Sequence, residues 1–443
     1  MNHYRHADGA TSAAPQALSH VEKPQARRAV GGSRSPARLA EPSSRTLQAA
    51  LRKTTERLAT ELGCPGPAAP DWSELEWRTA RASAAIHGVS SLLSATLRWE
   101  GTPGWERFLH EQRAHTMSRH RRTEEAFASI GARLCASGIA AVALKGATLY
   151  RMGVYAAGAR PMADLDLLVH EAELEPASRV LEGMGYHESL RSWRERTFTT
   201  DSCAPPSTLG EHCDRGIKVE LHTRICEKLP WHLTDITDLI FPGSLQPGLN
   251  GYRSQSSLMT HLLLHAAGSM AARSLRLVHL HDLALLSSRM RKEDWQELLS
   301  VRADSTGPWW ALPPLALTAR YYGRSVPAWV MADLVPFCQP LLRGLCRHQR
   351  LSDVSHSRLW IDAFPGLEWS RSVTEMLEFA LARIRPSEDT LAYRENTKKT
   401  ADWASNSQWY QLPQYRRVLR WVTSRPTRPP TMHALRAALA QPR

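Results

Sequence analysis

Two acidic residues inside one short apolar run constrain this chain more than any other feature. Asp164 and Asp166 lie two positions apart in the segment Asp164-Leu165-Asp166-Leu167-Leu168-Val169. On a β-strand, residues i and i+2 point to the same face, so the two carboxylates would lie side by side. Burying two like charges is costly unless a cation neutralises them, and oxygen ligands favour magnesium or manganese. The segment therefore predicts a strand with a Mg²⁺ or Mn²⁺ site on one face.

A third acidic residue and a Lys-Gly turn extend this pattern. Glu220 lies in a similar apolar setting, Val219-Glu220-Leu221-His222, and Lys145-Gly146 follows an earlier apolar run. Three strand-borne acids with such a turn favour phosphoryl chemistry on a nucleotide. We expect Asp164, Asp166 and Glu220 to be the metal-binding and catalytic residues, or Glu220 to act as the base on the acceptor hydroxyl. The competing interpretation makes these acids strand-end charges that pair with arginines.

The Lys-Gly turn is a candidate nucleotide-binding segment. Gly146 permits close approach of the backbone, and a helix that begins at Ala147 would point its free N–H groups at phosphate oxygens. Lys145 adds a cation for the triphosphate. The competing interpretation is a simple strand-to-helix turn with a solvent-facing lysine. Arg160 is a further nucleotide-binding candidate, because its guanidinium can clamp a triphosphate or pair with Asp164 or Asp166 in the metal-free state.

Two histidines are candidates for the same site. His222 lies two residues after Glu220 and shares its face, so it either binds the nucleotide and orients a phosphate or the acceptor, or packs as an ordinary histidine. His265 lies on an apolar helical segment, one turn after His261, and either faces a cleft or is packed. We expect the basic, histidine-bearing helices of residues 257–300 to close over the acids, with His265 and Arg276 as weaker candidates for lining that cleft.

The segment His279-Leu280-His281-Asp282 resembles a metal-binding pattern only superficially. On a helix, residues i and i+2 do not face each other, so we do not expect the two histidines to share a metal ion. Asp282 is expected to pair with an arginine such as Arg276.

Composition permits a globular protein with a polyanionic partner. The chain has 443 residues, 42% of them hydrophobic and 22% charged, and a net charge of +13. This length is sufficient for two domains. The basic balance fits nucleic acid, nucleotides or an anionic membrane surface, or it reflects free use of arginine. No stretch approaches the ~18 apolar residues of a membrane span, and the N-terminus lacks the apolar segment of a secretory signal.

The seven cysteines leave two interpretations. Cys203, Cys213 and Cys226 lie loosely near His212 and His222, which suggests a zinc site, although the spacing matches no standard zinc pattern. Free thiols are the alternative. The absence of a disulfide framework suits a reducing cytoplasm.

The chain divides into five expected regions: a disordered leader (1–44), an N-terminal helical region (45–135), a core of strands and helices (136–230), a helical domain (231–350), and a C-terminal helical extension with a basic tail (351–443). Within them we expect Asp71 to cap a helix, further helices at 83–97 and 105–136, and strands at 139–144, 165–169, 196–200 and 218–221. A turn is expected at Pro205-Pro206. Strand patterns fade after Pro230 and helical patterns dominate.

The order of these motifs resembles the uncharacterised bacterial nucleotidyltransferase family of the polymerase-beta-like superfamily. The resemblance covers roughly residues 100–300 and rests on the following segments: Leu144-Lys145-Gly146, Arg160-Pro161-Met162, Asp164–Val169, Gly185-Tyr186, Val219–His222, Leu262–Ala267 and Leu280–Ala284. It implies an α+β fold, a small mixed sheet flanked by helices, with an α-helical partner domain. The turn departs from the superfamily, which usually has Gly-Gly or Gly-Ser where this chain has Lys145-Gly146.

The resemblance also implies an activity. A member would transfer a nucleoside monophosphate from a nucleoside triphosphate to an acceptor, with Mg²⁺ or Mn²⁺ as cofactor and pyrophosphate as the second product. The acceptor is a protein, peptide, RNA or small molecule that the sequence does not identify, and neither base preference nor oligomeric state is predicted. The alternative is a non-catalytic nucleotide-binding or regulatory protein that retains the fold, for example within a toxin–antitoxin or peptide-modification gene cluster.

Overall fold

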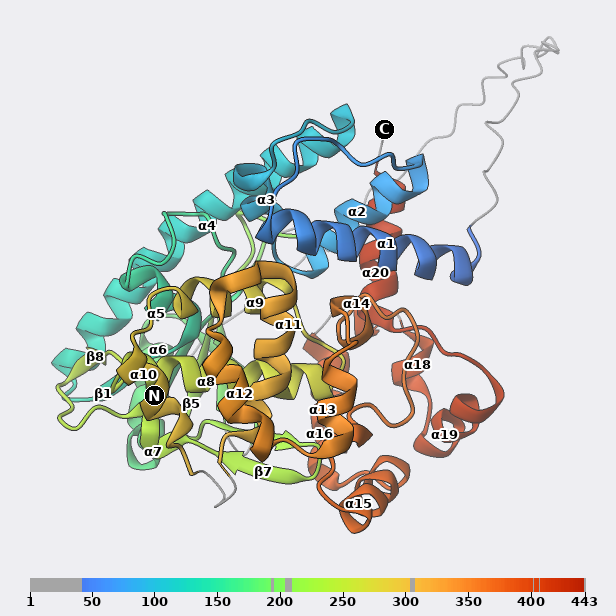
Figure 1. The fold of residues 1–443 in the computed structure, drawn as a ribbon. Coiled ribbons are helices and arrows are strands. Elements are labelled where there is room, and N and C mark those ends of the chain that lie inside the picture. Colours follow the sequence, from blue (N-terminus) through green and yellow to red (C-terminus); the bar gives the residue numbers. More distant parts are fainter. Residues whose placement is uncertain are drawn as a thin grey trace, which may run out of the picture. The chain divides into compact units, whose positions relative to one another are not determined.

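The computed structural model describes residues 42–192, 195–203, 209–302, 307–400, 402–405 and 407–441 (Figure 1). The predicted disordered leader lies outside the described residues except at its last three positions, of which Ser44 already begins a helix. The predicted turn at Pro205-Pro206 also lies outside them.

Four helices precede the sheet: α1 (Ser44–Gly63), α2 (Glu74–Ile86), α3 (Ser90–Thr96) and α4 (Pro103–Ala136). The cap predicted at Asp71 is wrong. Ser73 caps α2 instead, because its side chain accepts the Glu76 N–H while the Glu76 carboxylate accepts the Ser73 N–H. The helix predicted at 83–97 is interrupted at Gly88, which has φ +64°. A side chain at Gly88 would collide with the Arg276 guanidinium, so the chain turns where that arginine passes.

Within the described residues, six strands form one mixed sheet in the order β3-β4-β5-β2-β1-β8. Their bounds are β1 (Ala140–Ala143), β2 (Asp164–Val169), β3 (His187–Arg191), β4 (Glu195–Thr199), β5 (Lys218–His222) and β8 (Gly248–Asn250). Strands β2 and β5 are parallel neighbours at the centre, and their register places Asp164 opposite Lys218 and Asp166 opposite Glu220. Sheet pairing thus aligns the acids that the sequence separates by more than fifty residues.

The two faces of β2 have different neighbours. Leu165, Leu167 and Val169 pack into an apolar cluster with residues of α4 and of α6 (Leu174–Gly183). Leu168 belongs to the other cluster, together with residues of α8 (Gln255–Ala271). Because Asp164 and Asp166 alternate with the first set, they share the face of Leu168 and point toward the α8 side.

Strand formation continues past the predicted limit at Pro230. A separate hairpin pairs β6 (Cys226–Leu229) with β7 (His232–Asp235), and β8 adds to the sheet as a parallel neighbour of β1. The sequence predicts neither β7 nor β8, because four- and three-residue strands are too short to show a period-two pattern. The helices α5 (Lys145–Arg151) and α7 (Thr237–Ile240) lie in the connections.

Helices dominate the rest of the chain, as predicted. After α8 come α9 (Leu277–Ser287), α10 (Lys292–Leu299), α11 (Leu312–Tyr322), α12 (Ala328–Leu334), α13 (Pro340–Cys346), α14 (Leu351–Val354), α15 (Val373–Ile384), α16 (Glu388–Thr400), α17 (Asp402–Ser405), α18 (Gln408–Gln411), α19 (Gln414–Thr423) and α20 (Pro429–Ala440). None of the described helices has the length and apolar character needed to cross a membrane.

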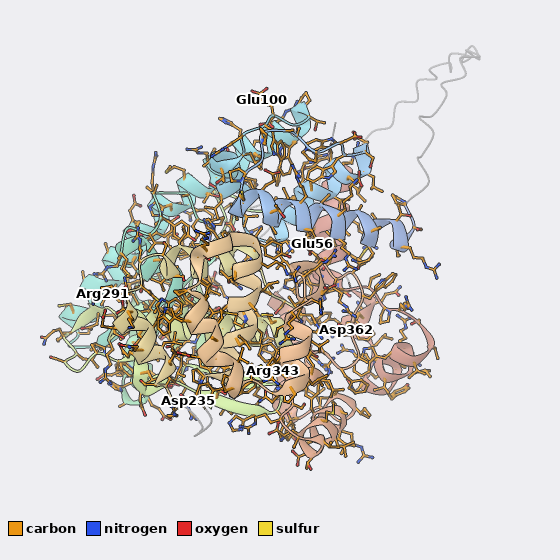
Figure 2. The ribbon with its side chains drawn as sticks, viewed as in Figure 1. Glu56, Glu100, Asp235, Arg291, Arg343 and Asp362 are labelled. Carbon is orange, nitrogen blue, oxygen red and sulfur yellow. The ribbon has the colours of Figure 1, made fainter. Side chains whose placement is uncertain are left out.

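The two ends of the described chain pack together. Helix α20 lies against α2 (Figure 1). Glu56 of α1 is labelled in Figure 2. Its carboxylate accepts hydrogen bonds from the Tyr321 hydroxyl and the Ser352 N–H. The buried Ser357 hydroxyl lies 2.6 Å from the Thr55 hydroxyl and 2.7 Å from His87 Nε2. The architecture is therefore the predicted mixed α+β fold, with a six-stranded sheet among helices and a helical C-terminal region.

Candidate active site

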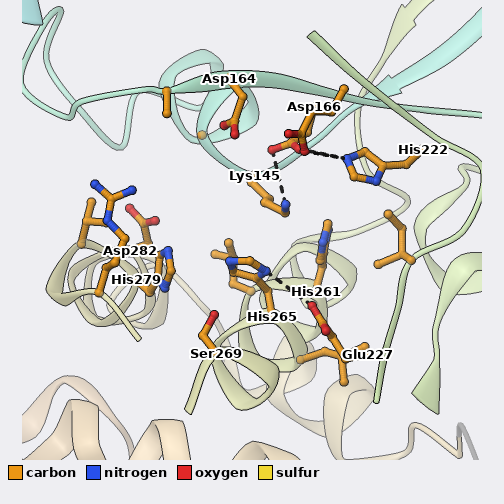
Figure 3. Close-up of a pocket in the computed structure, with 18 of the residues that line it drawn as sticks. Lys145, Asp164, Asp166, His222, Glu227, His261, His265, Ser269, His279 and Asp282 are labelled. Atoms are coloured by element: carbon orange, nitrogen blue, oxygen red, sulfur yellow. Dashed lines mark hydrogen bonds and ion pairs between the residues drawn. The ribbon is translucent and has the colours of Figure 1, made fainter. Parts of the chain in front are cut away.

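A pocket of about 400 Å³ lies between the sheet and helices α8 and α9. We call its two sides the sheet wall (Lys145, Asp164, Asp166, Glu220, His222) and the helical wall (His261, His265, Arg276, His279, Asp282). Figure 3 shows Asp164, Asp166 and Lys145 facing His261, His265 and His279 across this space. Every residue predicted to bind the metal, the nucleotide or the acceptor around the three acids lies in its lining, including the weaker candidates His265 and Arg276.

Asp166 is the centre of the sheet wall. Its side chain is 6% exposed, and its carboxylate lies 3.0 Å from His222 Nε2 and 3.4 Å from Lys145 Nζ. Burial raises the pKa of Asp166, but Lys145 and the hydrogen-bonded His222 outweigh this effect and hold the pKa well below its usual range. Asp166 is therefore an ionised, buried carboxylate.

Glu220 and His222 complete a tight group with Asp166. Ligand atoms of these three residues all lie within 4.8 Å of one another. Burial lowers the pKa of His222, but its contacts with Asp166 and Glu220 dominate and raise the pKa to about 9. At neutral pH the imidazole is therefore protonated, and its single positive charge lies between two acids. The Lys218 ammonium also pairs with Glu220.

Asp164 lies on the same face but outside this tight group. Burial, followed by the negative charges of Asp166 and Glu220, raises the pKa of its carboxyl above the usual range. The predicted side-by-side arrangement of Asp164 and Asp166 therefore produces the like-charge repulsion expected from the sequence. Among the described side chains, Asp166 has a hydrogen-bonded partner, His222, whereas Asp164 has none.

Lys145 adopts a rare backbone conformation. Its φ is +44°, in the left-handed region that non-glycine residues seldom occupy, and its N–H donates to the Tyr252 hydroxyl over 3.0 Å. The Tyr252 hydroxyl also lies 2.7 Å from His261 Nδ1. The helical wall thus holds the turn that positions the Lys145 ammonium. Burial lowers the pKa of Lys145, but Asp166, Asp164 and Glu220 together raise it above its usual value.

Gly146 leaves space for a neighbouring side chain rather than providing the conformation of the turn. The left-handed residue is Lys145, and α5 begins there rather than at Ala147. A Cβ at Gly146 would lie 2.7 Å from an Arg160 nitrogen and 3.3 Å from the Met162 sulfur. The missing side chain therefore makes room for the Arg160 guanidinium beside the turn.

Arg160 and Asp282 form a bidentate ion pair on the helical side. Arg160 Nε and Nη2 each donate to the Asp282 carboxylate over 2.7 Å, and the Tyr155 hydroxyl donates to it over 2.6 Å. The predicted pairing of Asp282 with Arg276 is wrong, because Arg276 donates instead to the Ile86 carbonyl. Arg160 also does not pair with Asp164 or Asp166. The sequence cannot show which distant arginine reaches an aspartate.

Two histidines of the helical wall, His261 and His279, have lowered pKa values and are neutral. Burial, together with the charge of Lys145 and the neighbouring His265, keeps the pKa of His261 well below its usual range. Burial and His265 have the same effect on the pKa of His279. His265 Nδ1 lies 3.7 Å from the Glu227 carboxylate, and its ring meets His279 edge-on (Figure 3).

Sequence reasoning missed Tyr252 and Glu227. Each is a single polar residue in a segment without a motif, so only the tertiary contacts reveal it. Among the described residues, the groups of side chains that could hold a metal ion include neither His279 nor His281.

The comparison with known families can now be set beside this geometry. The model of the uncharacterised nucleotidyltransferase family matches residues 73–320, which is more than half of the chain. The chain belongs to this family. Residues 73–320 include both walls of the pocket and all strands from β1 to β8. No curated protein and no solved structure matches the chain.

Proposed function

We propose that this protein transfers a nucleoside monophosphate from a nucleoside triphosphate to an acceptor and releases pyrophosphate, with Mg²⁺ or Mn²⁺ as cofactor. Residues 136–230 would supply the catalytic core and residues 231–350 the helical wall. The observation that carries the proposal is the buried group of Asp166, Glu220 and His222 beside Asp164, at the edge of a pocket large enough for a nucleotide.

The donor set fits a divalent cation. Asp166 and Glu220 offer carboxylate oxygens within reach of one another, and Asp164 lies on the same strand face. In the metal-free protein Lys145 and protonated His222 supply the compensating charge. A bound divalent cation would lower the pKa of the attacking hydroxyl and neutralise the leaving pyrophosphate.

The remaining residues would position the substrates. The Lys145 ammonium, released from Asp166, would pair with phosphate oxygens. Arg160 lies against Gly146, with its guanidinium fixed by Asp282 and by a hydrogen bond from Nη1 to the Pro161 carbonyl. It would present the N–H bonds that these contacts leave to the triphosphate without reorganisation. His222 would give up its proton and orient a phosphate or the acceptor.

An acceptor hydroxyl would lose its proton to a residue of the pocket. Glu220 remains the proposed base, because its carboxylate lies beside Asp166, where the reacting phosphate would bind. His265 and Arg276 line the opposite wall and would contact the nucleotide or the acceptor.

The direct test uses the purified full chain with each α-labelled nucleoside triphosphate, Mg²⁺ or Mn²⁺, and cell lysate as the acceptor source. We expect one triphosphate to leave label on an acceptor only when the divalent cation is present. Asp166→Asn should abolish labelling, whereas the surface variant Glu100→Gln, on the loop before α4, should not. Magnesium-dependent thermal stabilisation by a triphosphate without any label transfer would contradict the enzyme proposal and favour the non-catalytic alternative.

A further inference from the structure

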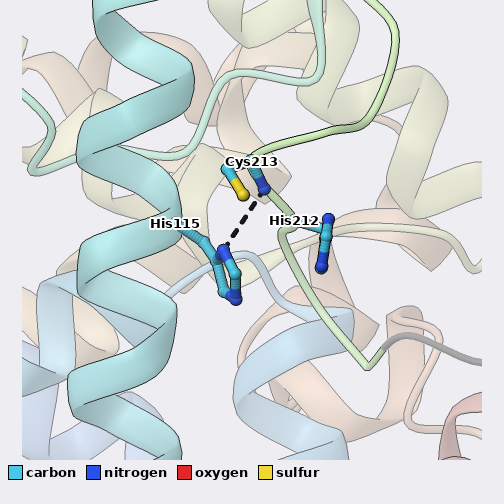
Figure 4. Close-up of side chains that lie close together, drawn as sticks. All are labelled: His115, His212 and Cys213. Carbon is cyan, nitrogen blue, oxygen red and sulfur yellow. Dashed lines mark hydrogen bonds between the residues drawn. The ribbon is translucent and has the colours of Figure 1, made fainter. Parts of the chain in front are cut away.

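A second group of metal-ligand side chains lies outside the pocket lining. His115 projects from α4, and His212 and Cys213 lie in the connection between β4 and β5 (Figure 4). Their ligand atoms all lie within 4.8 Å of one another, although His115 is 97 positions before His212 in the sequence. Tertiary folding therefore brings two imidazoles and a thiol together.

This group differs from the zinc site suggested by the sequence. Cys226 is buried in β6 and His222 belongs to the sheet wall, so both lie in the lining of the pocket instead. Cys203 is exposed. His115 could not be chosen from the sequence, because nothing in the pattern of α4 indicates which loop it meets.

The two imidazoles present unprotonated nitrogens to the same short segment. His115 Nδ1 accepts the Cys213 N–H over 3.2 Å, and His212 Nδ1 accepts the Asp214 N–H over 3.2 Å. A nitrogen that accepts a hydrogen bond carries a lone pair and no proton. Both lone pairs therefore point at adjacent residues of the segment that also carries the Cys213 thiol.

Other contacts already hold this segment against α4. The Gln112 side chain donates to the carbonyls of Leu209 and Glu211 and accepts the Glu211 N–H. Gly210 has φ +81°, and any side chain there would collide with Gln112. The side chain of Arg119 pairs with Glu211 at 3.1 Å. The positions of the three ligand residues are thus fixed before any ion binds, which reduces the entropic cost of binding.

We propose that His115, His212 and Cys213 bind a zinc ion that fastens the β4–β5 connection to helix α4. Two imidazole nitrogens and one thiolate form a donor set that suits tetrahedral zinc, with the fourth position taken by water or the Asp214 carboxylate. Zinc–ligand bonds of about 2.0–2.3 Å require ligand atoms roughly 3.3–3.7 Å apart. Because the ligand atoms now lie within 4.8 Å of one another, side-chain rotations that bring them up to about 1.5 Å closer would reach these separations.

Binding has a defined proton balance. The Cys213 thiol loses its proton to solvent and forms the Zn–S bond, while the two weak N–H···N hydrogen bonds are exchanged for Zn–N bonds. The imidazoles bind zinc in their neutral form, so zinc affinity should fall at acidic pH.

The site's position links it mechanically to the acids, independently of the proposed transfer reaction. The connection it fastens runs directly into β5, which carries Glu220. From the same helix, Arg119 donates to the Arg215 carbonyl over 2.9 Å and reaches the Ala163 carbonyl over 3.4 Å, next to Asp164. Zinc would therefore stabilise the segments that deliver two of the three acids.

Metal binding to the tag-free full chain tests the proposal. The protein is stripped with chelator, kept reduced, and titrated with Zn²⁺ and separately with Co²⁺. We expect about one equivalent of zinc, a rise in melting temperature on adding it, and a thiolate-to-cobalt charge-transfer band with Co²⁺. Cys213→Ser should abolish the band and weaken zinc binding at least tenfold, and His115→Ala should weaken it similarly.

Two matched controls separate this site from others. Cys135→Ser removes an exposed thiol at the end of the same helix and should leave both signals unchanged. Asp166→Asn disrupts the other metal-ligand group and should keep the cobalt band. Circular dichroism checks that each variant is folded. An unchanged zinc affinity and cobalt band in folded Cys213→Ser would overturn the proposal, as would loss of the band in Asp166→Asn alone.

Discussion

The two walls of the pocket place the same residue type in opposite charge states. On the sheet wall, His222 lies within 3.6 Å of three carboxylates, those of Asp166, Glu195 and Glu220, and its pKa is raised to about 9. On the helical wall, burial and nearby positive groups keep the pKa of His261 and His279 well below the ordinary value. The sheet wall concentrates negative charge. On the helical wall, Asp282 is paired with Arg160, and the Arg276 guanidinium donates to a backbone carbonyl. Neighbouring residues, rather than residue type, decide what each histidine can do.

This contrast assigns chemistry to one wall and positioning to the other. The sheet wall carries three carboxyl groups against two cationic side chains. Burial and the negative charges of Asp166 and Glu220 raise the pKa of the Asp164 carboxyl. A divalent cation would relieve this repulsion. The Arg160–Asp282 pair of the helical wall already satisfies its own charges. Substitutions of the sheet-wall acids should therefore mainly lower the rate of transfer, whereas substitutions on the helical wall should mainly lower stability or raise KM.

The largest effect is expected from the acids of the sheet wall. Asp166→Asn and Asp164→Asn should each lower nucleotidyl transfer by roughly 10³-fold. Their effects on stability should be opposite in the metal-free protein. Asp166→Asn leaves Lys145 and His222 without their shared partner and should lower the free energy of unfolding by about 3 kcal/mol. Asp164→Asn removes a repelled charge and should raise it by about 1 kcal/mol at pH 8.

Urea unfolding in the presence of chelator, alongside label-transfer assays, measures both quantities. Near-normal magnesium-dependent transfer by either variant would refute the assignment of catalysis to the sheet wall. Equal destabilisation by both would refute the difference in charge state between the two aspartates.

The next effect concerns the ion pair of the helical wall. Asp282→Asn should lower the free energy of unfolding by about 3 kcal/mol, because it leaves the buried Arg160 guanidinium without its carboxylate. A double-mutant cycle with Arg160→Gln isolates the coupling between them. Transfer by the folded Asp282→Asn variant should survive at a reduced rate. Complete loss of transfer with little loss of stability would show that Asp282 takes part in catalysis. The proposed division of roles between the two walls would then be wrong.

A smaller effect should appear in the pH dependence of stability without metal. Because folding raises the pKa of His222 from 6.5 to about 9, its stabilising contribution is complete below pH 6.5 and is lost as pH rises toward 9. The advantage of wild type over His222→Gln should therefore shrink by about 2 kcal/mol across this range. His261 should behave in the opposite sense, because its lowered pKa makes its contribution decline as pH falls below 6.5. Parallel pH profiles for the two variants would contradict the contrast.

The smallest effect is expected at His265. Replacing it with glutamine should raise the KM for nucleotide or acceptor about threefold and leave kcat and melting temperature nearly unchanged. His110→Gln, an exposed change on α4, serves as the matched control. A fall in kcat at unchanged KM would instead place His265 on the reacting atoms.

The sequence predicted the elements whose formation depends on neighbouring residues in the chain. The apolar run around Asp164 specifies a strand and its two faces, and the long periodic segment ending at Ala136 specifies α4. Contacts between distant segments were not predictable. The partner of Asp282, the Tyr252 contact behind Lys145 and the meeting of His115 with Cys213 each depend on which elements pack together. The three-residue strand β8 also escaped prediction, because its pairing with β1 rather than its own sequence defines it.

The packing of Ser357 against Thr55 and His87 has a consequence for how the chain is made. Helices α1 and α2 leave the ribosome long before Ser357 and α20, the segments that pack against them. Their buried polar groups and apolar faces must wait, solvated or held by chaperones, while about 300 further residues are synthesised. Folding therefore cannot proceed strictly from the N-terminus. A chain that stops before residue 429 lacks α20, so the face of α2 that packs against this helix should be exposed to solvent and to proteases.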